Sequence, residues 1–132
     1  MKKLVICLMS VTLLMLTLLA PTTAHAAENN EWVLYRISAP INYSTVNTSD
    51  IKNMTVHFGV NGWQEIKDVQ LNRSIVDYYM GRTFESFWVD VYLKKGSTLD
   101  YCFKYDFNSD KINWDNNSGK DYHVVVDKSN IN

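Results

Sequence analysis

The chain has 132 residues, with 13 basic and 14 acidic side chains and a formal net charge of −1. The basic residues form no cluster, which argues against a protein that binds nucleic acid. This length suits one domain with one modest hydrophobic core, and two domains are not expected.

The first 26 residues have the pattern of a secretory signal peptide. Lys2 and Lys3 precede an apolar run over 4–20, and small residues stand at the cleavage spacing in 24–26. A transmembrane anchor is the alternative, but the run is short for a full span and Pro21 follows it. We therefore expect a cleaved signal peptide at 1–26 and one secreted domain at 27–132, with no membrane contact after cleavage.

The rest of the chain alternates short apolar segments with turn-forming ones. We expect strands at 32–37, 54–60, 84–93, 99–107 and 121–126, a weaker apolar segment at 64–71, and polar turns or loops at 42–53 and 108–120. The segment 72–81 cannot be assigned to a strand or a helix. Since no long apolar repeat at helical spacing appears, the sequence predicts an all-β fold, an antiparallel β-sandwich of the immunoglobulin-like type.

Cysteine usage gives this domain no internal cross-link. Cys7 falls in the predicted signal peptide, so Cys102 is alone in the exported domain. It could be a reactive thiol or form a bridge to another chain. We favour a small buried or half-buried hydrophobic residue, which is the usual role of such a cysteine.

Four tryptophans stand in the exported domain, and their surroundings differ. Trp32 lies in an apolar strand and is expected to be a core or sheet-packing residue, while Trp88 is either a packing residue or an exposed platform. Trp63 and Trp114 each follow turn-forming residues and have polar neighbours. A flat indole can stack on the C–H face of a sugar ring while nearby amides bond its hydroxyls. The alternative is that one or both rings fold back over the end of the sheet as a lid on the core.

Three stretches of the chain resemble the family 25 carbohydrate-binding modules and their close relatives in family 53. They are 54–63 (MTVHFGVNGW), 99–107 (LDYCFKYDF) and 114–122 (WDNNSGKDY), of which the last is the most specific. The resemblance covers about 54–126 and implies a β-sandwich that binds starch. Carried over by motif position, it assigns α-glucan binding to His57, Trp63, Trp114 and Asn116.

The residues themselves leave alternatives at two of these positions. His57 lies on the polar face of its predicted strand, although a lone histidine is by default a structural hydrogen-bonding group. Asn116 is equally suited to bond its own backbone in a turn. The segment 68–81 fits the family pattern poorly, and its Tyr78 and Tyr79 would extend the binding face or cover the core.

The expected ligands are starch, glycogen or maltooligosaccharides. Family members commonly stand beside amylase-type domains, and this chain encodes none, so a separate amylase is a candidate partner. Acidic residues form no recognisable catalytic pair, and we expect no enzyme activity. The segment 106–110 begins like a calcium loop but lacks the later glycine and glutamate, so neither metal nor cofactor is expected. A protein-interaction domain of the same fold is the main alternative.

Overall fold

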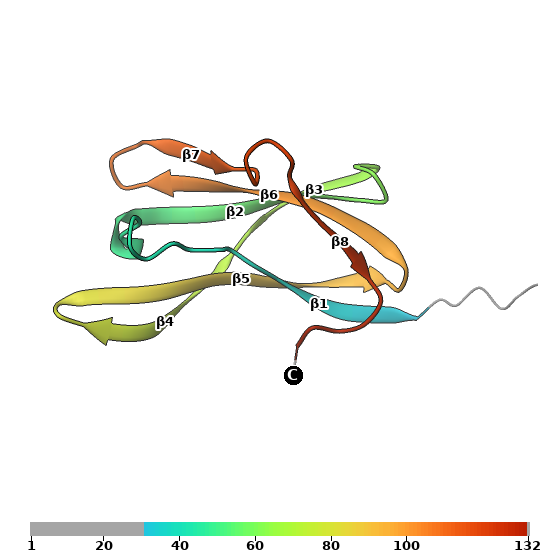
Figure 1. Cartoon of the computed structure of the whole chain (residues 1–132), viewed down its shortest axis with the longest axis horizontal. Coiled ribbons are helices and arrows are strands. Elements are labelled where there is room, and N and C mark those ends of the chain that lie inside the picture. The colour runs from blue at the N-terminus through green and yellow to red at the C-terminus, as the bar shows by residue number, and fades with distance from the viewer. Residues whose placement is uncertain (1–30, 132) are drawn as a thin grey trace, which may run out of the picture.

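The computed structural model describes residues 31–131, and strands dominate this part of the chain (Figure 1). In chain order the elements are β1 (Trp32–Ser38), the 3-10 turn η1 (Thr48–Asp50), β2 (Ile51–Val60), β3 (Glu65–Gln70), β4 (Asn72–Tyr79), β5 (Arg82–Lys94), β6 (Ser97–Phe107), β7 (Ile112–Asp115) and β8 (Tyr122–Val126). Over this range, no helix has the length and apolar character needed to span a membrane. The predicted signal peptide lies outside the described residues.

Two antiparallel sheets pack face to face, which confirms the predicted all-β sandwich. One sheet has the order β1-β5-β4 and the other β3-β2-β6-β7. β8 pairs with the first half of β6, and β7 pairs with the second half. Figure 1 shows the sheets as an upper and a lower layer, with the segment between β1 and η1 running between them.

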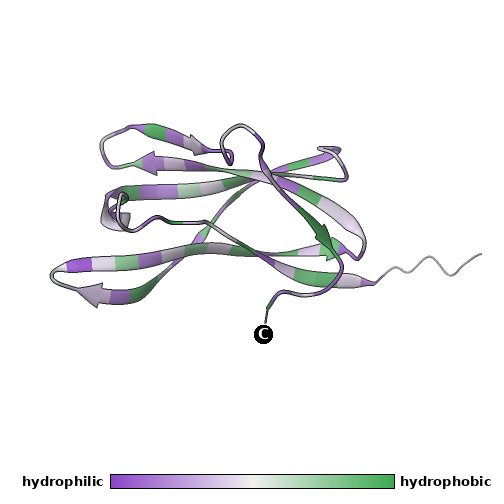
Figure 2. Ribbon diagram, viewed as in Figure 1, coloured by the Kyte–Doolittle hydropathy of each residue, from purple (hydrophilic) through white to green (hydrophobic). Residues whose placement is uncertain are grey.

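Alternating side chains from both sheets build the core. Figure 2 shows this alternation as hydrophobic and hydrophilic bands along the strands. The innermost hydrophobic side chains are Ile37, Ile51, Met54, Val56, Phe87, Leu99, Phe103 and Val126. Burying one such side chain stabilises the fold by about 1.5–3 kcal/mol. The strands predicted at 54–60, 84–93 and 99–107 are confirmed as parts of β2, β5 and β6.

Three segments differ from the sequence-based expectation. β7 lies within 108–120, which we predicted to be a loop, and β4 occupies most of the unassigned segment. β2 already begins at Ile51, inside the predicted polar turn. β4 and β7 lie at sheet edges and have largely exposed side chains, so the sequence shows only a weak hydrophobic pattern there. Backbone pairing with the neighbouring strand holds both segments in strand conformation.

The prediction that Trp32 belongs to the core is wrong, because its side chain is 63% exposed. Its neighbour Val33 points into the core, and successive strand side chains face opposite sides. Trp88 is half-buried, with the Cζ atom of Arg36 at 4.1 Å from the ring centroid. Arg36 is held there by two hydrogen bonds of 2.7 Å to Asp90. Trp88 is thus a packing residue rather than an open platform.

Candidate functional site

Three of the four predicted binding residues meet on the outer face of the larger sheet. The ring centroids of His57 and Trp63 lie 5.4 Å apart at an interplanar angle of 26°, so these rings stack. Trp114 meets His57 edge-on, with centroids 6.4 Å apart and an angle of 88°. We call these three rings the aromatic platform. They come from β2, the β2–β3 turn and β7, which are separated in sequence.

Strand β2 turns His57 outward because Val56 and Phe58 on either side of it are buried in the core. His57 stands opposite Asp68 of β3, and its Nδ1–H donates a hydrogen bond of 2.7 Å to the Asp68 carboxylate. This bond fixes the ring orientation and leaves Nε2 to bond a ligand hydroxyl. We did not predict from the sequence that Asp68 belongs to the site. The Asn61-Gly62 turn could have revealed it, since a tight turn there brings 57 and 68 into register.

Trp63 lies at the end of a turn with an unusual backbone. Asn61, Gly62 and Trp63 have φ angles of 51°, 75° and 65°, which is the left-handed region. Asn61 anchors the turn to β6, because its N–H donates to the Thr98 carbonyl at 2.9 Å and its Oδ1 accepts from the Thr98 N–H at 3.1 Å. A bulky residue in this conformation is strained, and such strain concentrates at functional sites.

The Trp63 ring lies directly over Gly59. A Cβ atom at Gly59 would come within 2.7 Å of Cε3 of the indole and 2.6 Å of the Trp63 Cα. Gly59 shares the outer face of β2 with His57, so the indole rests on the sheet and not over the core. Trp63 therefore does not fold over the core as a lid.

Trp114 projects from the edge strand β7 and is 55% exposed. It stands opposite Lys104 of β6, a residue of the outer face whose Nζ lies 3.0 Å from an Asp106 carboxylate oxygen. The large exposed fraction means that much of the Trp114 side chain faces solvent. Its indole is available to a ligand from the solvent side.

Asn116 belongs to a tight connection between β7 and β8. Its Oδ1 accepts a hydrogen bond of 2.9 Å from the Gly119 N–H, and its carbonyl accepts one of 2.8 Å from the Asp121 N–H. Its Nδ2 has no hydrogen-bond partner among the described residues and is left to donate. Asn116 therefore has the turn role that the sequence allowed, and a ligand contact by Nδ2 stays a prediction.

Cys102 lies opposite His57 across the β2–β6 pairing and is buried and unpaired. Burial raises the pKa of its thiol, and the negative charges of Asp121, Asp68 and Asp115 add to this effect. A raised pKa keeps the sulfur protonated near neutral pH, where it is a poor nucleophile. This position matches the buried hydrophobic residue that we favoured.

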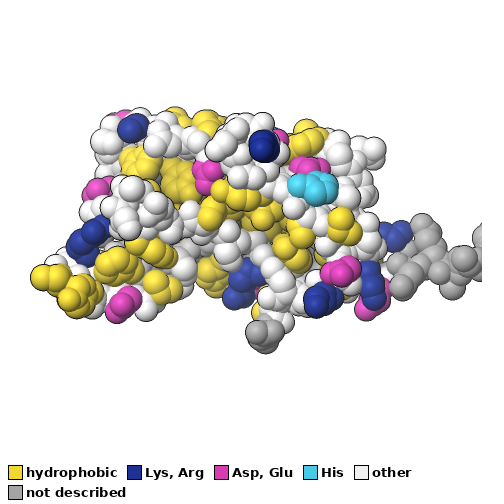
Figure 3. Space-filling view, in the orientation of Figure 1, with side chains coloured by type: hydrophobic (Ala, Val, Ile, Leu, Met, Phe, Trp, Pro, Cys, Tyr) yellow, Lys and Arg dark blue, Asp and Glu magenta, His cyan; other side chains and the backbone are white. Residues whose placement is uncertain are grey.

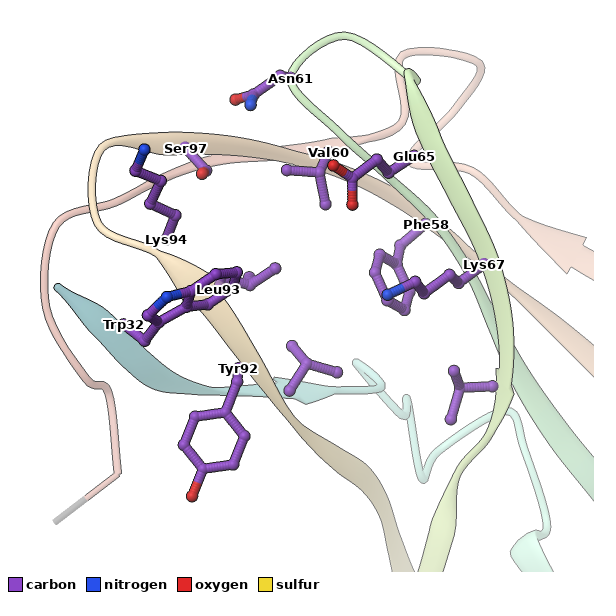
Figure 4. Close-up of a pocket in the computed structure, with 12 residues that line it drawn as sticks. Trp32, Phe58, Val60, Asn61, Glu65, Lys67, Tyr92, Leu93, Lys94 and Ser97 are labelled. Carbon is purple, nitrogen blue, oxygen red and sulfur yellow. The ribbon is translucent and has the colours of Figure 1, made fainter. Parts of the chain in front are cut away.

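A hollow of about 320 Å³ opens elsewhere, between the edges of the two sheets (Figure 4). Phe58 and Leu93 line it from the core, and Trp32 and Lys67 lie at its mouth. No ring of the aromatic platform lines this hollow. Trp32 is thus an exposed tryptophan separate from the platform.

Tyr78 and Tyr79 are 67% and 65% exposed on β4, in the sheet opposite the platform. They neither extend the platform nor cover the core.

Within residues 31–131, no group of three or more His, Cys, Asp or Glu side chains could hold a metal ion. No protein-family model and no curated protein matches this chain.

Proposed function

We propose that the domain is a secreted, non-catalytic module that binds starch or related α-glucans at the aromatic platform. One observation carries the proposal: His57, Trp63 and Trp114 form one contiguous group of rings on the outside of the sandwich. Such a group is costly to leave in water and suits a ligand with apolar ring faces. Pyranose rings have these faces, and their hydroxyls match the polar groups around the platform.

The angle between the two indoles favours an α-glucan over a straight β-glucan. Trp63 is inclined by 26° to the His57 ring and Trp114 by 88°, so the two indole planes stand steeply to each other. Successive glucose rings of a β-1,4 chain lie nearly in one ribbon and suit coplanar aromatic rings. The α-1,4 chain curves, and neighbouring glucose rings turn their faces in different directions. An angled platform fits the curved chain.

Polar groups beside the rings supply the hydrogen bonds that a sugar requires. In the neutral tautomer with Nδ1–H donated to Asp68, Nε2 of His57 accepts from a hydroxyl. Asn116 follows Trp114 by two residues and has an unused Nδ2 donor, in keeping with the resemblance to starch-binding modules. Aromatic stacking on a flat ring contributes about 1–3 kcal/mol per contact. Set against the cost of association, this gives a dissociation constant of roughly 10 µM to 1 mM.

Retention on insoluble starch tests the proposal. We expect the mature domain to sediment with granular starch, and Trp63→Ala or Trp114→Ala to weaken binding roughly 10- to 100-fold. Trp32→Ala is the matched control, because this tryptophan is exposed but lies away from the platform. Circular dichroism should show that all three variants stay folded. A folded wild type that remains in the supernatant would refute starch binding.

A protein-interaction domain is the second candidate. The observation in its favour is the exposed apolar surface of β4, where Ile75, Val76, Tyr78 and Tyr79 are each more than half exposed. Large apolar patches of this kind often mark protein interfaces. This role would use the opposite sheet, so loss of Tyr78 and Tyr79 would leave starch retention unchanged.

A further inference from the structure

A groove follows the inner side of β7, around the sheet edge from the aromatic platform. It consists of two adjoining hollows of about 230 and 570 Å³, which share Val46, Phe107 and Asn113 as lining residues. We call it the edge groove. In the space-filling view of Figure 3, hydrophobic side chains are visible in a hollow between β7 and the segment that precedes η1. The larger hollow is within the size range of small-ligand sites.

The inner wall of the edge groove is aromatic. Tyr105 and Phe107 of β6 lie nearly parallel, with ring centroids 6.3 Å apart and an interplanar angle of 13°. Phe107 is half-buried and Tyr105 is buried, so the open part of this wall is mainly the Phe107 ring. An apolar surface with neighbouring polar groups is thus presented to the groove.

Amide groups line the groove beside this wall. Asn113 stands opposite Tyr105 in the β6–β7 pairing, and its side-chain amide makes no hydrogen bond with any described residue. Asn42 uses its Oδ1 to accept from the Ser44 N–H at 3.1 Å, while its Nδ2 has no partner among the described residues. These amides can donate to and accept from hydroxyl groups. Aromatic rings with unused amides are the chemistry of a sugar site.

Trp114 connects the edge groove to the platform, since the same residue meets His57 edge-on and lines the smaller hollow. We infer that the edge groove is a second subsite for the same α-glucan chain and takes the glucose units that follow those on the platform. This inference rests on the proposed function. A curved chain that crosses the edge strand at Trp114 passes from the outer face of the sheet into the groove.

Affinity measured against chain length tests the second subsite. Calorimetric titrations with maltotriose and maltoheptaose compare a ligand that fills the platform with one that also reaches the groove. We expect Asn113→Ala to weaken maltoheptaose binding about 3- to 10-fold, as loss of one hydrogen-bonding group predicts, and to leave maltotriose binding unchanged. Asn113→Trp, which fills the groove, should have the same selective effect. Asn72→Ala, at an exposed asparagine of β4, is the matched control.

The outcomes separate this inference from the proposed function. If wild type and Asn113→Ala bind maltoheptaose equally while Trp63→Ala loses both ligands, the platform stands and the second subsite is wrong. Equal losses for both ligands in Asn113→Ala would also overturn the subsite, because Asn113 would then act on the platform or the fold. If the folded wild type binds neither ligand, the proposed function fails and the subsite with it.

Discussion

At the scale of single residues, the platform depends on the lack of a side chain at one position. Trp63 can lie over Gly59 only because Gly59 has no Cβ atom. A Cβ there would clash with the Trp63 backbone as well as with its indole ring. Backbone atoms cannot move aside as a flexible side chain can. The position of the indole beside His57 therefore requires glycine at 59.

Gly59→Ala should displace Trp63 and weaken starch binding at least as much as loss of one stacking contact, about 1–3 kcal/mol. Gly62→Ala is the control in the same turn, because a Cβ there meets no atom within 4 Å but the φ of 75° is unfavourable. It should cost about 1 kcal/mol of folding stability and leave affinity nearly unchanged. Starch sedimentation and urea unfolding measure the two effects. Equal affinity in Gly59→Ala and wild type would contradict this account.

Strand alternation was sufficient to predict the outward position of His57 from the sequence. The same rule places Trp32 outward, but there the apolar composition of the segment outweighed it in our prediction. The contact between His57 and Trp114 could not be derived in this way. It depends on β6 lying between β2 and β7, and strand order is a property of the whole fold.

At the scale of elements, one arginine ties the β4–β5 hairpin to the opposite sheet. Arg73 of β4 bonds Glu85 of β5 through two hydrogen bonds of 2.8 and 2.5 Å. It also donates to the carbonyls of Ile51 and Thr48, each at 3.0 Å. Glu85 is buried, so removal of Arg73 would leave its carboxylate without the partner that offsets the cost of burial.

Arg73→Met should destabilise the domain by about 2 kcal/mol. This is below the 3–5 kcal/mol of a fully buried pair because the Arg73 side chain is 36% exposed. Arg82→Met is the control, since Arg82 is exposed and makes one long bond of 3.4 Å to the Tyr43 carbonyl. Urea unfolding measures both variants. Equal midpoints for the two would show that the Arg73 network contributes no net stability.

The strands that the sequence predicted least well are the ones at sheet edges. β7 has four residues and is held by its backbone pairing with β6, so its residues carry little hydrophobic pattern. β4 is exposed along its whole length and contains a register shift between Ile75 and Asp77. A bulge interrupts the alternation that identifies a strand. Predicting either strand requires knowing which strand it pairs with.

At the scale of the whole molecule, the fold raises the pKa of several groups that lose a proton at alkaline pH. Burial is the first cause that raises the pKa of Tyr101, Tyr105 and Cys102. Burial, together with the hydrogen bond that the Tyr122 hydroxyl donates to Asp115, raises the pKa of Tyr122 to about 12. Tyr101, Phe103 and Tyr122 form one ring cluster on β6 and β8, so the pKa shifts of Tyr101 and Tyr122 depend on the packing of those strands.

The raised pKa values predict that stability falls as pH rises above about 9, beyond the ordinary pKa of a thiol and then of tyrosine. There the unfolded chain releases protons that the folded chain retains, so alkali favours unfolding, by up to about 1.4 kcal/mol per pH unit for each such group. Below the unfolded pKa values both states are protonated and the effect vanishes.

Urea midpoints at pH 7, 9 and 10.5 should fall across the series. Tyr122→Phe should be less stable at pH 7, because it removes the hydroxyl that donates to Oδ2 of Asp115, but should lose less stability with rising pH. A midpoint that stays constant to pH 10.5 would mean that these side chains ionise as easily in the folded domain as in the unfolded chain.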